Sequence, residues 1–433
     1  MNHKTENLII IGASARAAAQ SAVRAGFHVF AADLFADEDL RAIATAVRIR
    51  DYPRGLLAAA ERFPPGPFIY TGGLENHPEI LAAISKTRPL LGAGPVLLSQ
   101  VRDPVTLFSA LAAAEIPCPA TRLEPPPADD PLPWLVKPLR SCGGSGVRPW
   151  RPEDAEAAAL AGREIAPAIG RGKRRLRAER RGFHDNGPFP DRWSGPPKPA
   201  VFQQWLAGTP VSAAFLGAGG AARLLGTFRQ LIGVPWTGAR GFQYAGAILH
   251  RSMPGAGEPD VEADRQWRRI GEVIVRRFGL TGLFGVDAID FAARLFALEV
   301  NPRWTASMEL IDRAGMRETG ESLISLHVQG CRGDAIGVYR RGRAEPAEQP
   351  TPACSAKAVL YATRPLVVGE RFQELARESN EQERWGAFAD LPTCGTRINP
   401  SQPFCTVFSE GPNEEATINT LRAHANVAFD SAE

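Results

Sequence analysis

The segment VDAIDFAARLFALEVNPRW, residues 286–304, holds the acidic and amide side chains best placed to do chemistry together. If residues 292–294 form a three-residue hairpin loop, Asp287 lies directly opposite Glu299, because cross-strand partners have position numbers with a constant sum. Two facing carboxylates repel each other and cost stability unless a cation lies between them. Asn301 shares the face of Glu299, since side chains alternate along a strand. This oxygen-only set suits Mg²⁺, which takes its remaining ligands from phosphates and water.

Another acid of this hairpin, Asp290, has the opposite parity and is expected to face away from the set. A surface strand end with solvated acids is the simpler alternative, and the hairpin residues alone leave both interpretations open. Phosphate-binding groups elsewhere in the chain would favour the metal site.

Such groups occur in WLVKPLRSCGGSGVRPW, residues 134–150, where Lys137 ends an apolar strand and a glycine-rich loop follows. The ammonium group of a lysine suits phosphate, and the N–H groups of a flexible glycine loop can close over phosphate oxygens. The lysine precedes the glycines, which excludes a Walker A motif. No motif places a histidine base beside Cys142, so we interpret it as a small turn residue and not a nucleophile. Arg140 and Arg148 either contact phosphate or only flank the loop.

Upstream elements predict a layer that could position this lysine. Residues 7–33 read as strand, alanine-rich helix and strand, and a further strand at 68–73 and a helix at 77–85 extend the layer to about residue 95. The first turn, GASARA, lacks the G-x-G-x-x-G spacing, which favours a parallel-sheet scaffold over a dinucleotide site.

Downstream, a helix is expected at 104–114, and strands within 200–230 include a hairpin that turns at 217–220. In the intervening residues 171–198, the stretch 171–181 carries seven basic residues, and a Pro/Gly-rich run follows it. We interpret them as a solvated insertion, with binding of an acidic substrate or polymer as the alternative. Further helices are expected at 261–278 and 414–426.

Composition sets the outer limits on function. The 433 residues suggest two to four domains, with 44% apolar and 22% charged residues. A net charge of +3 gives no reason to expect a nucleic-acid or membrane partner. The first residues lack a signal-peptide core, so a cytoplasmic location is expected. The six cysteines form no C-x-x-C pair, which disfavours a zinc site or a disulfide framework.

A lysine followed by a glycine loop, with a D…E-x-N-x-R hairpin far downstream, resembles the ATP-grasp superfamily of ATP-dependent carboxylate–amine ligases. The resemblance covers roughly residues 5–330. It implies a multidomain fold of α/β and α+β type, in which a Rossmann-like layer precedes a two-lobed ATP-grasp fold with antiparallel sheets and a small C-terminal β-rich domain. The implied domains are 1–100; 101–206, with the glycine lid and the insertion 171–198; 207–335, with the metal hairpin; and 350–433.

The resemblance also implies roles for individual residues, with ATP and Mg²⁺ or Mn²⁺ as cofactors. Lys137 matches the lysine that contacts ATP phosphates, and Arg303 the arginine that stabilises the transferring phosphoryl group or the acyl phosphate. The metal ligands are Asp287, Glu299 and Asn301. The mobile lid spans 141–147, with Ser141, Gly143, Gly144, Ser145 and Gly146 as nucleotide-binding residues.

The stretch FQQWLAGTPVS resembles the adenine hinge of the superfamily. It makes Gln203, Gln204, Trp205 and Leu206 nucleotide-binding candidates, with the backbone of Gln204 and Leu206 at the adenine edge. Gln203 departs from the family, since many members have an acid there. Pro104 departs as well, because it stands where a phosphate-contacting lysine is frequent; Arg102 is the candidate substitute.

The acceptor pocket is expected between the hinge and the metal hairpin, with candidates Arg229, Arg240 and Tyr244, each of which also has a purely structural interpretation. The implied reaction phosphorylates a carboxylate to an acyl phosphate, which an amine attacks to give an amide, ADP and phosphate. The implied partners are small-molecule carboxylates and amines, and a homodimer is compatible with the sequence. A narrower similarity points to ligases of the tyramine–glutamate type, associated with methanofuran or other one-carbon cofactors.

Two alternatives stay open at this stage. Pro104 and Gln203 would suit an ATP-grasp protein that binds ATP without catalysing ligation. The C-terminal stretch GTRINPSQPFCTVFSEG resembles the last domain of biotin carboxylase, which would suit a carboxylating enzyme.

Overall fold

The computed structural model describes residues 5–127, 129–151, 200–250, 261–318, 320–333, 352–382 and 386–432. The predicted insertion 171–198 and the predicted boundary between 335 and 350 lie outside the described residues.

The N-terminal layer is a four-stranded parallel sheet of order β3-β2-β1-β4. Its strands are β1 (Asn7–Ile11), β2 (His28–Asp33), β3 (Thr45–Arg48) and β4 (Phe68–Tyr70), and its helices are α1 (Arg16–Arg24), α2 (Glu38–Arg41), α3 (Gly55–Arg62) and α4 (Pro78–Ser85). The side chains from Leu8 to Ile11 are 0% exposed because helices cover both faces of the sheet. A 3₁₀ turn, η1 (Leu74–Asn76), follows β4.

The scaffold interpretation of this layer is consistent with the environment of Asp33, the acid at the end of β2. Its carboxylate accepts hydrogen bonds from the backbone N–H groups of Ala15 (3.2 Å), Phe35 (3.0 Å) and Ala36. Through these bonds the carboxylate connects the turn after β1 to the turn after β2.

The next unit contains two helices and a small antiparallel sheet of order β5-β8-β6-β7. Its elements are α5 (Pro95–Val101), α6 (Pro104–Ala113), β5 (Thr121–Arg122), β6 (Trp134–Pro138), β7 (Arg148–Pro149) and β8 (Ala200–Gln204). Helix α6 begins where expected, because the Asp103 side chain caps it by accepting the N–H of Thr106, and Pro104 occupies its first turn.

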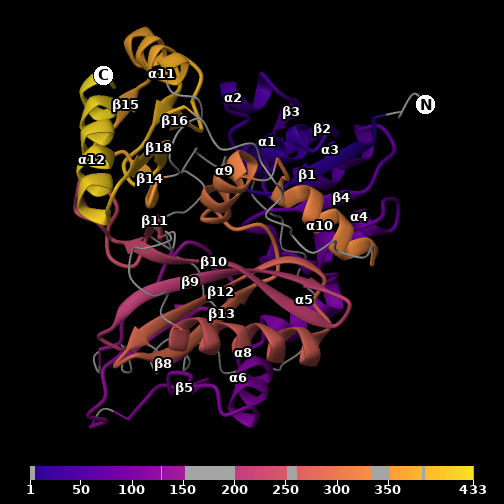
Figure 1. Cartoon of the computed structure of the whole chain (residues 1–433), viewed down its shortest axis with the longest axis vertical. Coiled ribbons are helices and arrows are strands. Elements are labelled where there is room, and N and C mark those ends of the chain that lie inside the picture. Colours follow the sequence, from indigo (N-terminus) through magenta and orange to yellow (C-terminus); the bar gives the residue numbers. More distant parts are fainter. Residues whose placement is uncertain are drawn as a thin grey trace, which may run out of the picture.

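The large sheet has eight strands in the order β13-β12-β9-β10-β11-β14-β18-β16. Its first five strands are β9 (Thr209–Ala218), β10 (Ala221–Ile232), β11 (Tyr244–His250), β12 (Gly282–Phe291) and β13 (Arg294–Asn301). The hairpin predicted at 217–220 is confirmed, with Ala218 paired to Ala221 across two glycines of positive φ. Helix α8 (Val261–Phe278) lies along the β12–β13 side of this sheet (Figure 1). Its Trp267 and Ile274 belong to the same buried cluster as Phe215 of β9.

The C-terminal segment adds β14, β18 and β16 to the same sheet, since β11 pairs with β14, whereas β15 and β17 pair with each other in a separate sheet. Its elements are β14 (Cys354–Tyr361), β15 (Leu366–Val367), α11 (Glu370–Gln382), β16 (Phe388–Ala389), β17 (Arg397–Ile398), β18 (Pro403–Gly411) and α12 (Glu414–Ser431). Helix α12 is longer than expected because its buried face continues past residue 426 to Ala428. The fold-class prediction of a parallel layer followed by antiparallel sheets is confirmed.

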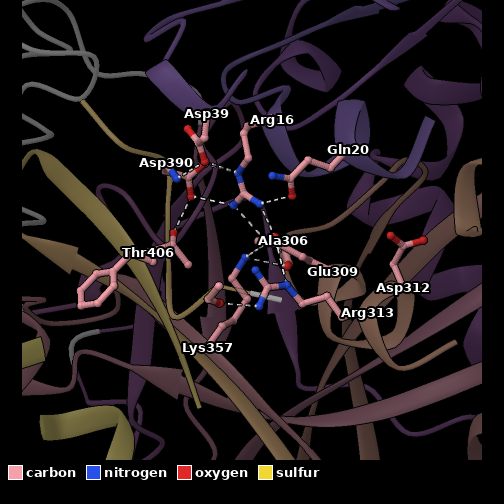
Figure 2. Close-up of polar contacts among 12 residues, drawn as sticks. Arg16, Gln20, Asp39, Ala306, Glu309, Asp312, Arg313, Lys357, Asp390 and Thr406 are labelled. Atoms are coloured by element: carbon pink, nitrogen blue, oxygen red, sulfur yellow. Dashed lines mark hydrogen bonds and ion pairs between the residues drawn. The ribbon is translucent and has the colours of Figure 1, made fainter. Parts of the chain in front are cut away.

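A buried charge cluster joins three regions, which are the N-terminal layer, helix α9 and the C-terminal segment (Figure 2). Arg16 of α1, 1% exposed, pairs with Glu309 at the start of helix α9 (Met308–Glu318) and, at 2.9 Å, with Asp390 of the C-terminal segment. Lys357 of β14 donates to Glu309 at 2.6 Å and to the carbonyl of Ala306 at 3.2 Å. Each region therefore contributes at least one charge to the same cluster.

The cluster also fixes the position of α9. Burial alone would raise the pKa of Glu309, but Arg16, Lys357 and Arg313 outweigh burial and hold that pKa well below its usual range. The loop that precedes α9 is therefore held against the N-terminal layer by an ionised and fully paired carboxylate.

We expect Glu309→Gln to lower the free energy of unfolding by about 3–5 kcal/mol at pH 7, because Arg16 and Lys357 would lose their shared anion. Folding lowers the pKa of Glu309, so the stability that its charge contributes is complete above pH ~5. This stability declines as pH falls from the unfolded pKa of about 4.3 toward the lower pKa of the folded protein. Urea titrations at pH 7 and pH 3.5 measure both effects. A difference from wild type that does not shrink at pH 3.5 would contradict the assignment. Glu262→Gln, on the exposed face of α8, is the control.

Candidate functional site

The hairpin of β12 and β13 pairs Asp287 with Glu299, as predicted, but by a different route. The turn has two residues, Ala292 and Ala293, both with positive φ, and Phe291 pairs with Arg294. A register shift between Asp287 and Ala288 leaves one residue of β13 extra, and this bulge brings Glu299 opposite Asp287. The three-residue loop was wrong, and the cross-strand pair was right.

The three oxygen-bearing side chains of this hairpin converge. Asn301 Nδ2 donates to Asp287 Oδ2 at 2.9 Å, and Gln230 Nε2 of β10 donates to Asp287 Oδ1 at 2.8 Å. Burial raises the pKa of Asp287, and the facing Glu299 raises it further. The two facing carboxylates therefore repel each other, and a cation between them would relieve this repulsion.

Cations of the chain already approach this hairpin. Arg102, at the end of α5, places Nη1 3.3 Å from Glu299 Oε2 and 3.5 Å from Asn301 Oδ1. Desolvation opposes the charge of Glu299, but Arg102 and Lys137 outweigh it and lower the pKa of Glu299. Burial lowers the pKa of Lys137, and the carboxylates of Glu299 and Asp287 oppose that shift. Lys137 thus belongs to the same electrostatic site, although it lies on the smaller sheet.

Arg303 connects the site to the N-terminal layer. Its Nη2 pairs with Glu75 Oε1 of η1 and lies 3.3 Å from Asn301 Oδ1, while Nη1 donates to the Trp304 carbonyl at 3.0 Å. Burial opposes the charge of Arg303, but Glu75 outweighs it and raises the pKa of the guanidinium. The arginine is therefore held as a cation beside the amide of the metal hairpin.

The glycine loop between β6 and β7 is fastened on two sides. Asn76 Nδ2 of the N-terminal layer donates to the Ser141 carbonyl at 3.2 Å, and the N–H of Tyr244 donates to the Gly143 carbonyl at 3.0 Å. Gly144 has a φ of +77°, and a Cβ at this position would overlap the carbonyl oxygen of Phe242. Gly146 also has positive φ, at +74°, so the loop follows a path that favours glycine.

Cys142 lies in this loop under the influence of charged neighbours. Burial raises the pKa of the Cys142 thiol to about 12, and Glu75 contributes to the shift. A thiol that keeps its proton is a poor nucleophile, which supports its interpretation as a small turn residue.

The predicted hinge lies on and after β8. Gln203 accepts a hydrogen bond from Lys137 Nζ at 3.0 Å and donates to Thr121 at 3.2 Å, so its side chain positions the lysine. The N–H groups of Gln204 and Trp205 donate to the carbonyls of Ala120 and Pro133, both at 2.8 Å. Among the described residues, the N–H of Leu206 donates no backbone hydrogen bond of this kind.

The three acceptor-pocket candidates separate in the structure. Arg229 pairs with Glu414 at the start of α12, where it docks the C-terminal helix. The side chain of Arg240 is exposed. Tyr244 is different: its hydroxyl is buried and has no hydrogen-bond partner within the described ranges. Burial raises the pKa of Tyr244, and the charge of Asp287 raises it further. Of the three, only Tyr244 is placed by these contacts close to the metal hairpin.

The donor set fits a hard divalent cation. Asp287 and Glu299 face each other, and Asn301 Oδ1 is directed toward the cations Arg102 and Arg303. Within the described part of the chain, no group of three or more His, Cys, Asp or Glu could hold a metal. Two carboxylates and an amide oxygen are too few to enclose a metal, and such a set suits one that takes its other ligands from phosphate and water.

The fold thus brings the glycine loop and Lys137 to the hairpin that holds Asp287, Glu299 and Asn301. Residues 101–307 match the family model described as the ATP-grasp domain. No curated protein matches the sequence. Among the described residues, no helix is long and apolar enough to cross a membrane.

Solved structures share the fold over the whole chain. The biotin carboxylase domain of 2-oxoglutarate carboxylase from Hydrogenobacter thermophilus has a TM-score of 0.62 at 13% identity, over 100% of this chain and 91% of that chain. The carboxyaminoimidazole ribonucleotide synthase from Aspergillus clavatus has a TM-score of 0.62 at 11% identity, over 98% and 99%. The N5-carboxyaminoimidazole synthetase from Staphylococcus aureus has a TM-score of 0.60 at 15% identity, over 98% and 99%. Identities this low establish a common fold and nothing about substrates.

Sequence reasoning missed Gln230 and Glu75, which contact predicted site residues. Glu75 follows β4 in the first layer, and the carboxyl ends of parallel strands are where ligands bind in open α/β sheets. That rule could have drawn attention to GGLEN. For Gln230 the sequence offers no signal, because its contact with Asp287 depends on the pairing of β10, β9 and β12.

We expect Gly144→Ala to release the glycine loop, because its Cβ would overlap a backbone oxygen that cannot turn away. Gly143→Ala is the matched control, since Gly143 also has positive φ but a Cβ there meets nothing within 4 Å. Overpacking costs about 1–3 kcal/mol, so amide exchange of 141–147 should rise roughly tenfold more in Gly144→Ala than in Gly143→Ala. Equal exchange in the two variants would show that the contact with Phe242 does not hold the loop.

Proposed function

We propose that this protein is an ATP-dependent ligase that joins a carboxylate to an amine through an acyl phosphate, releasing ADP and phosphate. One observation carries the proposal: Lys137, Arg102 and Arg303 surround the Asp287–Glu299–Asn301 set, and a fastened glycine loop lies beside them. Transfer of a phosphoryl group from ATP to a carboxylate needs cations around the phosphate oxygens and the exclusion of water.

The first step is transfer of the terminal phosphoryl group of ATP to the carboxylate. Lys137, oriented by Gln203, would contact the phosphates from the side of the small sheet. Arg102 would contact them from α5 and supply the charge that Pro104 cannot. A divalent cation held by Asp287, Glu299 and Asn301 would neutralise charge on the phosphate oxygens.

The second step is attack of the amine on the acyl phosphate. Arg303 would stabilise the negative charge on the acyl phosphate and on the leaving phosphate, because its guanidinium is fixed by Glu75 and by the Trp304 carbonyl. The glycine loop would keep water from the acyl phosphate while it is fastened to Asn76 and Tyr244.

The contacts of Arg102 and Gln203 bear on the non-catalytic alternative. The departures at 104 and 203 motivated it, but Arg102 reaches the metal hairpin and Gln203 orients Lys137. These contacts support a site with its cations in place. The association with methanofuran or one-carbon cofactors, the cytoplasmic location and a homodimer remain predictions.

A carboxylating reaction is the second candidate, because the similar folds include a biotin carboxylase domain that was crystallised with MgADP and bicarbonate. In that case bicarbonate would be the carboxylate that is phosphorylated. The same cationic residues would serve, so a substrate assay must separate the two.

We expect Glu299→Gln to abolish turnover, at least a hundredfold, while the fold survives, because one of two metal-facing charges is lost. Asp290→Asn is the matched control. Asp290 lies on the same strand as Asp287, but three residues further along, so it belongs to the opposite face of the strand. Steady-state phosphate release and thermal unfolding measure the two properties. Wild-type turnover in Glu299→Gln would refute the metal assignment.

Phosphate release from ATP and Mg²⁺ with amino acids, other carboxylates and bicarbonate, each with and without primary amines, would identify the reaction. We expect release that depends on both a carboxylate and an amine, with the amide detected by mass spectrometry. Release that depends on bicarbonate alone would favour the carboxylating reaction. Retained ATP binding without turnover on any acid would refute the ligase.

A further inference from the structure

Three buried polar atoms without hydrogen-bond partners lie together between the N-terminal layer and the metal hairpin. They are Tyr52 Oη, Glu75 Oε2 and Arg303 Nε, and no described residue bonds to any of them. The Glu75 side chain is 1% exposed and that of Arg303 is 11% exposed. Buried polar atoms are rarely left unpaired in native proteins, so a cluster of three needs a reason.

The three atoms share one neighbourhood. Glu75 Oε1 pairs with Arg303, and Oε2 of the same carboxylate has no hydrogen-bond partner among the described residues. Tyr52 Oη lies beside the turn, because a Cβ at Gly73 would be 2.7 Å from it. Burial raises the pKa of Tyr52, and Glu75 raises it further, so the phenol keeps its proton beside the carboxylate. This neighbourhood offers an anionic acceptor, a hydroxyl and a guanidinium N–H.

The location matches that of a substrate and not that of the nucleotide. The turn η1 follows β4, at the carboxyl end of a parallel strand, where open α/β sheets bind ligands. Lys137 and the hinge lie on the small sheet, whereas Glu75 and Tyr52 belong to the N-terminal layer. Arg303 contacts both Asn301 of the metal hairpin and Glu75, so a group bound at Glu75 would lie next to the acyl phosphate.

Building on the proposed function, we propose that Glu75 and Tyr52 form the seat of the amine substrate, which binds as a primary ammonium ion on Glu75 Oε2. A carboxylate that is buried, paired on one oxygen and free on the other suits a cation with several N–H donors. An anionic substrate would be repelled by this oxygen and would bind on the other side of Arg303.

The seat also serves the second step of the reaction. Glu75 takes one proton from the ammonium ion, and the nitrogen lone pair then forms the C–N bond to the acyl carbon. The C–O bond to phosphate breaks, phosphate leaves with the bonding pair, and the second nitrogen proton passes to the departing phosphate. The products are the amide, inorganic phosphate and a protonated Glu75 that returns its proton to water.

The same turn fastens the lid. Asn76, next to Glu75 in η1, donates to the Ser141 carbonyl of the glycine loop at 3.2 Å. Binding of an ammonium ion at Glu75 therefore stabilises the turn that holds the loop closed. This coupling would delay closure of the loop until the nucleophile is present.

The binding test uses titration calorimetry of the whole protein with ADP, Mg²⁺ and a panel of probes: n-propylamine, ethanolamine and the common amino acids, with n-propanol as the uncharged match. We expect at least one amine to bind wild type, and Glu75→Gln to weaken it roughly 10- to 100-fold, as for loss of a charge-assisted hydrogen bond. Glu79→Gln, an exposed acid on α4, is the control and should bind as wild type does. Equal binding to Glu75→Gln would overturn the proposal.

A second variant covers the case in which Glu75→Gln misfolds because Arg303 loses its partner. Tyr52→Phe removes only a hydroxyl to which no described residue is hydrogen-bonded, so the fold should tolerate it. We expect the amine KM to rise several-fold with little change in the ATP KM. An unchanged amine KM, or a fall in kcat alone, would overturn the seat and leave Glu75 as a structural partner of Arg303.

Coupling to the lid has its own readout. Amide exchange of 141–147 should slow when the bound amine probe is added to wild type with ADP and Mg²⁺, and this response should vanish in Asn76→Ala. Asn7→Ala removes a similar side chain–backbone bond elsewhere in the layer and serves as the control. A response that persists in Asn76→Ala would refute the coupling.

Failure of the proposed function would look different. Absence of turnover on every acid and amine, with retained binding of an amine that depends on Glu75, would refute the ligase and keep the seat. Amine-dependent turnover with an unchanged amine KM in both Glu75→Gln and Tyr52→Phe would refute the seat and keep the ligase.

Discussion

The buried pair of Arg16 and Glu309 is the contact on which the arrangement of the site depends. Arg303 belongs to the loop between β13 and α9, and this loop can face the N-terminal layer only if α9 is docked there. Glu309, at the start of α9, is bound by Arg16 of α1 and by Lys357 of β14 (Figure 2). Burying these charges is costly unless every partner is present, so the N-terminal layer, helix α9 and the C-terminal segment must assemble together.

This constraint explains why the site lies at a junction. The metal hairpin belongs to the large sheet, Lys137 to the small sheet and Glu75 to the parallel layer. Each of these groups is placed by a separate set of backbone hydrogen bonds, and only the contacts between regions bring their side chains together. A ligase must hold a nucleotide, an acid and an amine in one place, and such a junction offers each reactant a different wall.

Local patterns predicted the elements well, because apolar periodicity and turn residues report on short stretches of chain. The pairing of Asp287 with Glu299 was predicted although the turn was wrong, since the bulge compensates for the shorter loop. Contacts such as Gln230 with Asp287 could not be predicted, because they depend on the strand order of the large sheet. Arg229 was a candidate for the pocket with a structural alternative, and its partner Glu414 comes from a distant segment that no local pattern connects to it.

The departures at 104 and 203 are best understood together. Gln203 is uncharged, so it can orient Lys137 by a hydrogen bond without neutralising its ammonium group, whereas an acid there would compete with phosphate for that charge. Arg102 brings a second cation to the hairpin from the end of α5. It lies two residues before Pro104, the first residue of α6, which stands in the place of the missing lysine. The cationic character of the phosphate site would then be kept by a different set of residues. The charge balance of the site, and not the identity of each position, is what phosphoryl transfer requires.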